Sequence, residues 1–367
     1  MEQLKTQCEN CAADQVYLPG TKGLSCNYCG HFTEFKTEET AANEANEELC
    51  LSSYLESYSP LPEEQIERHI VKCSGCGAQP ELEENQESGN CPFCDSPIVV
   101  GQAQSKKLIK PQGLLAFDVS RSQARESFSS WLKGLWFAPN SLQKQITQHE
   151  KFKGIYLPYW TYDCETKTQY RGQRGDDYYE TVTRQNSDGE SVSEQVRKTR
   201  WRSVRGEVYD SFDDVLVPAT HSLPRKMLYE LEPWDLNNVV DYKKEYLSGY
   251  VTESYQVDLK EGFIEAKDIM KPQIERTIHR DIGGDRQQIT STQTQFSKET
   301  FKHLLCPVWV SAYRHKGELY QILVNARTGE IQGERPYSWV KIGLTALSVA
   351  ALVGIGVYFY QVNAGSV

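Results

Sequence analysis

The sequence lacks the short motifs that mark the commonest catalytic sites. It contains no Gly-x4-Gly-Lys-Ser/Thr phosphate loop, no His-Glu-x-x-His motif and no Gly-x-Ser-x-Gly nucleophile elbow. We therefore expect a protein that is not an enzyme. An enzyme built on the mixed α and β part of the chain stays open as a third reading, which a pocket with converging titratable groups would favour.

Positive charge is scarce in the first 100 residues, where 5 Lys and Arg stand against 18 Asp and Glu, and the whole 367-residue chain carries a formal net charge of −10. A protein that binds the nucleic-acid backbone needs cations to displace condensed counterions. Nucleic acid is therefore an unfavoured partner. The N-terminus also lacks a basic start followed by an apolar run, so we expect no secretory signal there and a reducing compartment.

Cysteine, in contrast, is plentiful and ordered. Eight of the 11 cysteines form four Cys-x2-Cys pairs, arranged in two copies of the pattern Cys-x2-Cys-x14-Cys-x2-Cys that lie 65 residues apart. Four thiolates complete the tetrahedral shell of a structural Zn²⁺ and leave no position for water. The sequence predicts two structural zinc sites, whose ligands are Cys8, Cys11, Cys26 and Cys29 in one and Cys73, Cys76, Cys91 and Cys94 in the other.

Two other chemistries use similar pairs, namely a rubredoxin-like iron site and thioredoxin-like redox pairs. Matched sets of four favour zinc. Because each set is already complete, His31 and His69 are interpreted as surface residues beside the sites. The isolated Cys50, Cys164 and Cys306 lie in apolar or mixed segments and are interpreted as buried structural thiols.

The pattern between and after the cysteine sets predicts an α+β fold class: two N-terminal zinc ribbons, a mainly antiparallel α+β domain and one C-terminal transmembrane helix. The predicted units are a zinc ribbon at residues 1–36, an acidic helical connector at 37–72, a second zinc ribbon at 73–101, an α+β domain at 102–336, the transmembrane helix at 337–362 and an exterior tail at 363–367.

Within these units, apolar spacing predicts helices near residues 49–58, from 61 through Ile66 and Ile70, and over 121–135. Trp234, Tyr242, Tyr246 and Tyr250 indicate a helical aromatic layer. Short strands are predicted over 155–162, 168–171, 178–184, 195–204, 215–217, 276–282, 287–296, 307–313, 319–325 and 330–332, with a hairpin turn at 186–189.

Two polar segments of this region have a structural and a functional reading. The basic run of five Lys and Arg between Arg197 and Arg205 is typical of a solvated hairpin face, although it could contact lipid headgroups or an acidic partner. Asp281-Ile282-Gly283-Gly284-Asp285 is interpreted as a two-glycine turn between strands rather than a cation site.

Residues 342–362 form an uncharged, predominantly apolar run. As a helix it would be about 31 Å long, close to the hydrocarbon thickness of about 30 Å. Trp339 at one end and Tyr358 and Tyr360 at the other suit the membrane interfaces. Since Arg335 and Lys341 precede the run and no Lys or Arg follows it, the positive-inside rule predicts a tail-anchored protein with its N-terminal region in the cytoplasm.

Together, the eight cysteines, the segments Leu157-Pro158-Tyr159-Trp160 and Pro307-Val308-Trp309, residues 325–329 and the terminal apolar run resemble a bacterial family. These are membrane-anchored zinc-ribbon proteins, often labelled primosomal protein N′ (replication factor Y) helicase-like, some of which accompany phage-shock and flotillin-like (SPFH) membrane-stress proteins. The resemblance implies the eight cysteines as zinc ligands and recruitment of a partner at the membrane. The helicase label does not carry over, because the chain has neither a phosphate loop nor an Asp-Glu-x-His box.

The sequence therefore predicts a single-pass, zinc-binding adaptor in the bacterial cytoplasmic membrane that presents zinc ribbons to protein partners. The resemblance implies SPFH or phage-shock-type membrane proteins as such partners. Ala346, Ala350 and Gly354 recur every four residues, and small residues at this spacing let two membrane helices approach closely. Homo-oligomerisation through this helix therefore stays an open alternative. The alternative is a nucleic-acid-binding zinc-ribbon protein of the replication or transcription type without helicase activity.

Overall fold

The fold is described from a computed structural model, which describes residues 7–35, 47–57, 65–81, 88–99, 103–137, 152–185, 191–315, 318–335 and 338–364. Some predictions lie outside these residues: the hairpin turn at 186–189, most of the acidic stretch after residue 36, the helix start at 61–64 and the last three residues of the predicted tail. The side chains of Tyr358 and Tyr360 are also outside the description.

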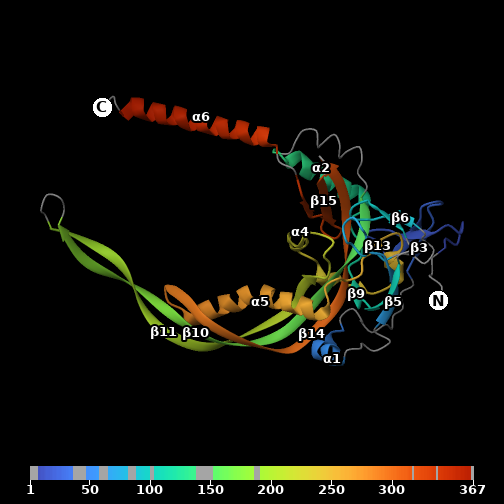
Figure 1. The fold of residues 1–367 in the computed structure, drawn as a ribbon, viewed down its shortest axis with the longest axis horizontal. Coiled ribbons are helices and arrows are strands. Elements are labelled where there is room, and N and C mark those ends of the chain that lie inside the picture. The colour runs from blue at the N-terminus through green and yellow to red at the C-terminus, as the bar shows by residue number, and fades with distance from the viewer. Residues whose placement is uncertain are drawn as a thin grey trace.

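A long, curved antiparallel sheet forms the body of the protein (Figure 1). Its strand order is β11-β10-β14-β15-β16. Short strands attach to it at the sides, two of them in parallel pairs. The class is thus mixed α+β with mainly antiparallel strands, as predicted. The strands are β10 (Lys153–Gln185), β11 (Ser191–Pro218), β14 (Arg286–His315), β15 (Glu318–Asn325) and β16 (Ile331–Gly333), with β4 (Leu49–Cys50), β9 (Gly113–Leu114), β12 (Val240–Asp241) and β13 (Val251–Thr252) at the sides.

The three long strands replace several shorter predicted ones. β10 alone has 33 residues and takes in three predicted strands. β14 pairs with β10 only as far as Gly175↔Arg286, whereas β10 and β11 stay paired to Gln185↔Ser191. Residues 176–185 and 191–200 therefore form a two-stranded arm that extends beyond the rest of the sheet (Figure 1).

Helix α5 (Leu259–Ile282) lies along one face of the long strands (Figure 1). Asp258 caps its N-terminus by accepting a hydrogen bond from the Glu261 backbone N–H at 2.8 Å, and Gly283 ends it with a φ of 61°. The prediction of a strand over 276–282 is wrong, since these residues are the last turns of α5. Its buried residues form one face, most of them three or four positions apart: Leu259, Gly262, Phe263, Ala266, Met270, Ile274, Ile278 and Ile282.

Helix α2 (Arg121–Gly134) confirms the helix predicted over 121–135. Ser120 and Gln123 form a capping box at its start, and Ala124, Phe128 and Leu132 are buried. α1 (Leu51–Ser57) likewise confirms the helical segment near residue 50.

The helix predicted through Ile66 and Ile70 is wrong. These residues form β5 (Gln65–Ile70), which pairs with β8 (Gln104–Ile109), a partner about 40 residues further along the chain. The predicted aromatic layer exists, but only in part as helix: Tyr246 lies in the short η5 (Lys244–Leu247), whereas Tyr242 lies outside any helix and packs against the same core. The neighbouring helices are α4 (Arg225–Glu230) and η4 (Leu236–Asn238).

The two cysteine sets fold as small antiparallel units. β1 (Gln15–Tyr17), β2 (Gly23–Cys26) and β3 (Phe32–Glu34) make a three-stranded sheet around the first set, and β6 (Ser88–Asn90) pairs with β7 (Pro97–Val99) beside the second. The last helix, α6 (Trp339–Ala364), leaves the body and extends away from it (Figure 1).

Candidate metal centres

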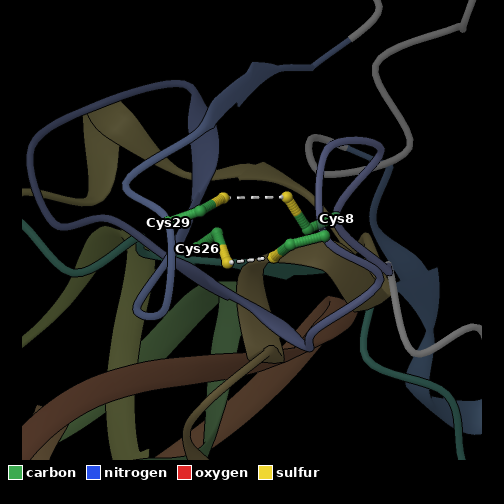
Figure 2. A group of neighbouring side chains, drawn as sticks. Cys8, Cys26 and Cys29 are labelled. Atoms are coloured by element: carbon green, nitrogen blue, oxygen red, sulfur yellow. Dashed lines mark hydrogen bonds between the residues drawn. The ribbon is translucent and has the colours of Figure 1, made fainter.

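The structure brings the eight predicted ligands into two groups of four. Cluster 1 is Cys8, Cys11, Cys26 and Cys29, and cluster 2 is Cys73, Cys76, Cys91 and Cys94. Within each cluster the four sulfurs lie within 4.8 Å of one another. Figure 2 shows Cys26 and Cys29, which belong to one turn, facing Cys8 from another part of the chain in cluster 1.

The sulfur–sulfur distances suit a metal better than a disulfide. In cluster 1 they are 3.5 Å for Cys8–Cys29 and for Cys11–Cys26, and in cluster 2 they are 3.6 Å for the corresponding pairs. A disulfide requires about 2.05 Å. Tetrahedral Zn²⁺ with bonds of about 2.3 Å places its sulfurs about 3.8 Å apart. Both clusters are therefore compatible with one zinc ion each.

The same backbone turn occurs four times, once at the first cysteine of each Cys-x2-Cys pair. The backbone N–H four residues later donates to the carbonyl of that cysteine, as in Gly30 to Cys26 at 2.9 Å and Gly77 to Cys73 at 2.9 Å. The residue at this position has a positive φ in every case. The sequence indicates the turn at Gly30 and Gly77 through glycine; at the other two pairs Ala12 and Asp95 occupy the left-handed conformation, which glycine-based reasoning misses.

The thiols of each cluster share protons unequally. In cluster 2 the hydrogen bond from Cys76 lowers the pKa of Cys91 to about 5, while the same bond raises the pKa of Cys76. In cluster 1 a hydrogen bond from the His31 backbone lowers the pKa of Cys29 to about 6. A dication held by these four sulfurs would favour the deprotonated form of every thiol in the cluster.

Cluster 1 lies at the surface. Cys29 and Tyr28 are exposed, Tyr28 to 85%, and Leu18 and Phe32 are also exposed. On its other side the unit is tied to the body through Tyr17, whose backbone N–H donates to Ser248 O at 3.0 Å and whose ring packs edge-on against another tyrosine.

Cluster 2 is built into the main core. Cys73, Cys91 and Cys94 are buried and belong to one apolar cluster with strands of the central sheet. Phe93 is fully buried, and its carbonyl accepts a hydrogen bond from Gln321 Nε2 at 3.3 Å. The segment that follows Cys76 of cluster 2 is also hydrogen-bonded to the body, because the Ser254 backbone N–H donates to Gln79 O at 3.2 Å.

The other cysteines and the histidines have mixed outcomes. Cys164 and Cys306 are buried, as predicted. Cys50 is exposed, so the prediction that it is buried is wrong. It is the last residue of the two-residue strand β4. Hydrogen bonds to its sulfur, chiefly from the Ser52 side chain, lower the pKa of the Cys50 thiol to about 7. His69 is exposed and His31 is partly buried, and neither belongs to a ligand group among the described residues.

The basic run lies on β11 opposite acidic residues of β10. Arg197 pairs with Asp177 and Lys198 with Glu180. The Arg200 guanidinium lies 5.2 Å from the ring centre of Tyr178. The interpretation as a solvated hairpin face therefore fits the structure.

The two-glycine segment is a turn, as predicted, but it joins α5 to β14 rather than two strands. Gly283 and Gly284 both have positive φ, and Asp285 accepts a hydrogen bond from the Asp177 backbone N–H at 2.8 Å. The similar segments that contain Trp160 and Trp309 lie side by side on the antiparallel pair β10 and β14, with Leu157 opposite Cys306.

A carboxylate group that sequence reasoning missed is formed by Glu48, Asp163 and Asp213, which are far apart in the chain. Burial is the largest cause that raises the pKa of Asp163 to about 6. Lys302 Nζ lies 3.8 Å from Glu48 of this group and 2.8 Å from the neighbouring Asp214, so a buried cation offsets part of the negative charge there.

Helix α6 meets the length and apolarity required to cross a bilayer. The candidate segment is Trp339–Val357, and none of it is buried against the body. Ala346, Ala350 and Gly354 are all exposed on this helix.

Comparison with known proteins gives one distant similarity. The chain is 23% identical over 353 residues to the uncharacterized protein YdjG of Bacillus subtilis strain 168, a match that spans 92% of this chain and 91% of the relative. No family model matches the chain. No solved structure matches it either.

Proposed function

We propose that this protein is a membrane-anchored zinc-binding adaptor. In this proposal both clusters hold structural Zn²⁺, α6 crosses the bacterial cytoplasmic membrane once, and the unit around cluster 1 binds protein partners on the cytoplasmic side. The observation that carries the proposal is the exposed apolar side chains of Leu18, Tyr28 and Phe32 around a cysteine cluster that leaves no ligand position open.

The metal role rests on the donor set. Four cysteines per cluster are the ligand set of structural zinc, and the clusters stand on four equivalent turns whose backbone hydrogen bonds fix the cysteines. Such a site stabilises a fold and does not activate water. Metal analysis of the purified chain is expected to give two zinc ions per chain, whereas iron, visible by its colour, would overturn zinc.

The membrane role rests on α6. Its exposed apolar residues have no partner in the body over the described part of the chain. Arg335 precedes α6 and Lys341 lies in its first turn, at the end proposed to face the cytoplasm. Tethering raises the local concentration of a weak binding surface near other membrane proteins. SPFH and phage-shock-type membrane proteins are the partners that we propose to test first.

Anchoring is tested with the full chain and its Leu347→Arg/Val353→Arg variant, since both side chains are exposed on α6. Two arginines in the apolar span cost about 5–7 kcal/mol of insertion free energy. We expect the unsubstituted chain to stay with vesicles in alkaline carbonate and the variant to be released. Release of both forms would overturn the anchor.

Partner binding is tested by pull-down from detergent-solubilised membranes. Tyr28→Ser/Phe32→Ser removes exposed rings next to cluster 1 without removing a cysteine, so zinc content should stay at the level of the unsubstituted chain. The matched control is Tyr179→Ser on the arm, where the side chain is 67% exposed. We expect the first variant to lose partners that the control retains. Equal retention by both would overturn the role of cluster 1 in docking.

The alternative function, nucleic-acid binding, is weakly supported by the arrangement of the basic residues on β11. Phosphate binding by the basic run would have to compete with Asp177 and Glu180, which already pair with Arg197 and Lys198. A DNA or RNA mobility shift that weakens with salt would favour that reading instead.

A further inference from the structure

The segment that directly follows α2 exposes two aromatic side chains, unlike most apolar residues of the helix itself. Phe128, Leu132 and Leu135 pack into the core, but Trp136 is 73% exposed and Phe137 is 37% exposed. Exposing a whole tryptophan to water is unfavourable, because the ring is mostly apolar surface. These two residues therefore form a candidate contact surface.

This surface adjoins the first turn of α6, although about 200 residues separate the two in the chain. The Ser338 backbone N–H donates to Phe137 O at 2.8 Å, and Lys341 Nζ donates to Trp136 O at 3.0 Å. Trp339, at the start of α6, is 81% exposed. Three exposed aromatic residues thus lie at the junction between the end of α2 and the start of α6, which Figure 1 shows next to each other.

The position and chemistry of the junction point to lipid. The first turn of a membrane-spanning helix lies at the membrane interface, where tryptophan rings are favoured because one end of the ring is apolar and the N–H can be hydrated. Lys133, which is exposed in the last turn of α2, and Lys341 add positive charge, which attracts anionic headgroups.

We propose that Trp136, Phe137 and Trp339 form one interfacial anchor, which inserts into the headgroup region of an anionic phospholipid bilayer around the base of α6. The proposal rests on the membrane insertion of α6 proposed above and adds a second contact, made by the body itself. With one helix alone the body could swivel about its connection to α6. With α2 also at the interface, the body has a defined orientation to the membrane.

The direction of α6 does not alter this anchor. In Figure 1, α6 and the arm formed by β10 and β11 extend from the body toward the same side. The arm carries Asp177, Arg197 and Lys198 and cannot enter hydrocarbon. For α6 to cross a bilayer that the arm does not enter, the chain would have to turn after Ser338. The hydrogen bond from the Ser338 backbone N–H to Phe137 O lies before that turn and keeps Trp136 and Phe137 at the base of α6.

The test is tryptophan fluorescence of the full chain in vesicles of phosphatidylcholine and phosphatidylglycerol, with and without lipids brominated near the headgroup end of the acyl chains. The Trp136→Phe variant identifies the signal of Trp136 by difference. Trp201→Phe is the matched control, because Trp201 is 44% exposed on β11, away from α6. We expect brominated lipid to quench the Trp136 component and to leave the Trp201 component unchanged.

The outcomes separate this anchor from insertion itself. Trp339→Phe gives the quenching expected for a residue at the start of the span. Quenching of Trp339 with none of Trp136 overturns the anchor and leaves the membrane helix standing. Absence of quenching at both positions, together with release of the chain by carbonate, overturns both proposals. Quenching of Trp136 that persists without phosphatidylglycerol would overturn the requirement for anionic lipid.

Discussion

Clusters 1 and 2 share their cysteine spacing and their backbone turns, but they differ in what surrounds them. The third residue of the second Cys-x2-Cys pair shows the difference most directly: it is Tyr28 in cluster 1, 85% exposed, and Phe93 in cluster 2, fully buried. The shared spacing thus sets the geometry of the four sulfurs in each candidate metal site. The residues between the ligands decide whether that site faces solvent or becomes part of a core.

The difference assigns separate roles to the two copies. Cluster 2 is held from several directions, for example by Lys153, whose Nζ donates to Cys91 O at 3.2 Å and pairs with Asp95 at 3.1 Å. Cluster 1 meets the body on one side and exposes Tyr28 and Phe32 on the other. We infer that cluster 2 serves stability and that cluster 1 is the copy available to partners.

The largest expected effect is the loss of cluster 2. In Cys73→Ser/Cys76→Ser the proposed zinc site loses half of its ligands, and structural zinc contributes about 10–16 kcal/mol of apparent binding free energy in small domains. That exceeds or matches the stability of a typical domain, about 5–15 kcal/mol. We expect the body to unfold or aggregate, as measured by circular dichroism and denaturant unfolding of the purified chain.

The matched variant is Cys8→Ser/Cys11→Ser. It should lose one zinc and the fold around cluster 1 while the transition of the body stays near that of the unsubstituted chain. If both double variants destabilise the body equally, the distinction between the two clusters is wrong.

A smaller effect on the free energy of unfolding is expected from single substitutions of Phe93 in cluster 2 and Tyr28 in cluster 1. Phe93→Ala leaves a cavity in the main core and should lower the free energy of unfolding by about 3–5 kcal/mol. Tyr28→Ala removes an exposed ring and should change it by no more than about 0.5 kcal/mol. Urea unfolding of the zinc-loaded chains measures both, and a similar loss in the two variants would contradict the assigned environments.

Local signals made parts of the structure predictable. The eight cysteines carry their own spacing, and the structure brings them together as two sets of four. α2 was predictable because its apolar period and the cap at Ser120 lie within one segment. The apolar run of α6 is likewise a property of consecutive residues.

Features that depend on distant partners were not predictable in this way. β5 reads as a helix locally but pairs with β8. The end of α5 contains Ile278 and Ile282 at four-residue spacing, yet Thr277 and the isoleucines also favour strands, and the sheet face that buries them is distant in sequence. The burial of cluster 2 also depends on β10 and β14, so spacing alone could not separate it from cluster 1.

The smallest expected effect concerns the contact that joins the cluster 2 segment to the body. Glu253 is buried there and its Oε1 accepts hydrogen bonds from Gln256 Nε2 at 2.9 Å, the Gln79 backbone N–H at 3.4 Å and the Ser222 hydroxyl. Burial raises its pKa from 4.5 to about 7. The folded chain therefore holds a proton that the unfolded chain has released, so stability should fall as the pH rises from about 4.5 to about 7 and stay level above.

Between pH 6 and pH 8 this single group should account for a loss of about 1 kcal/mol, most of it below pH 7. Glu253→Gln stays neutral, so its urea midpoint should depend less on pH over this interval than that of the unsubstituted chain. Glu81, whose pKa burial also raises to about 7, leaves a residual slope in the variant. An unchanged pH dependence would mean that Glu253 is ionised in the folded protein, and the contact between cluster 2 and the body would then need a compensating cation.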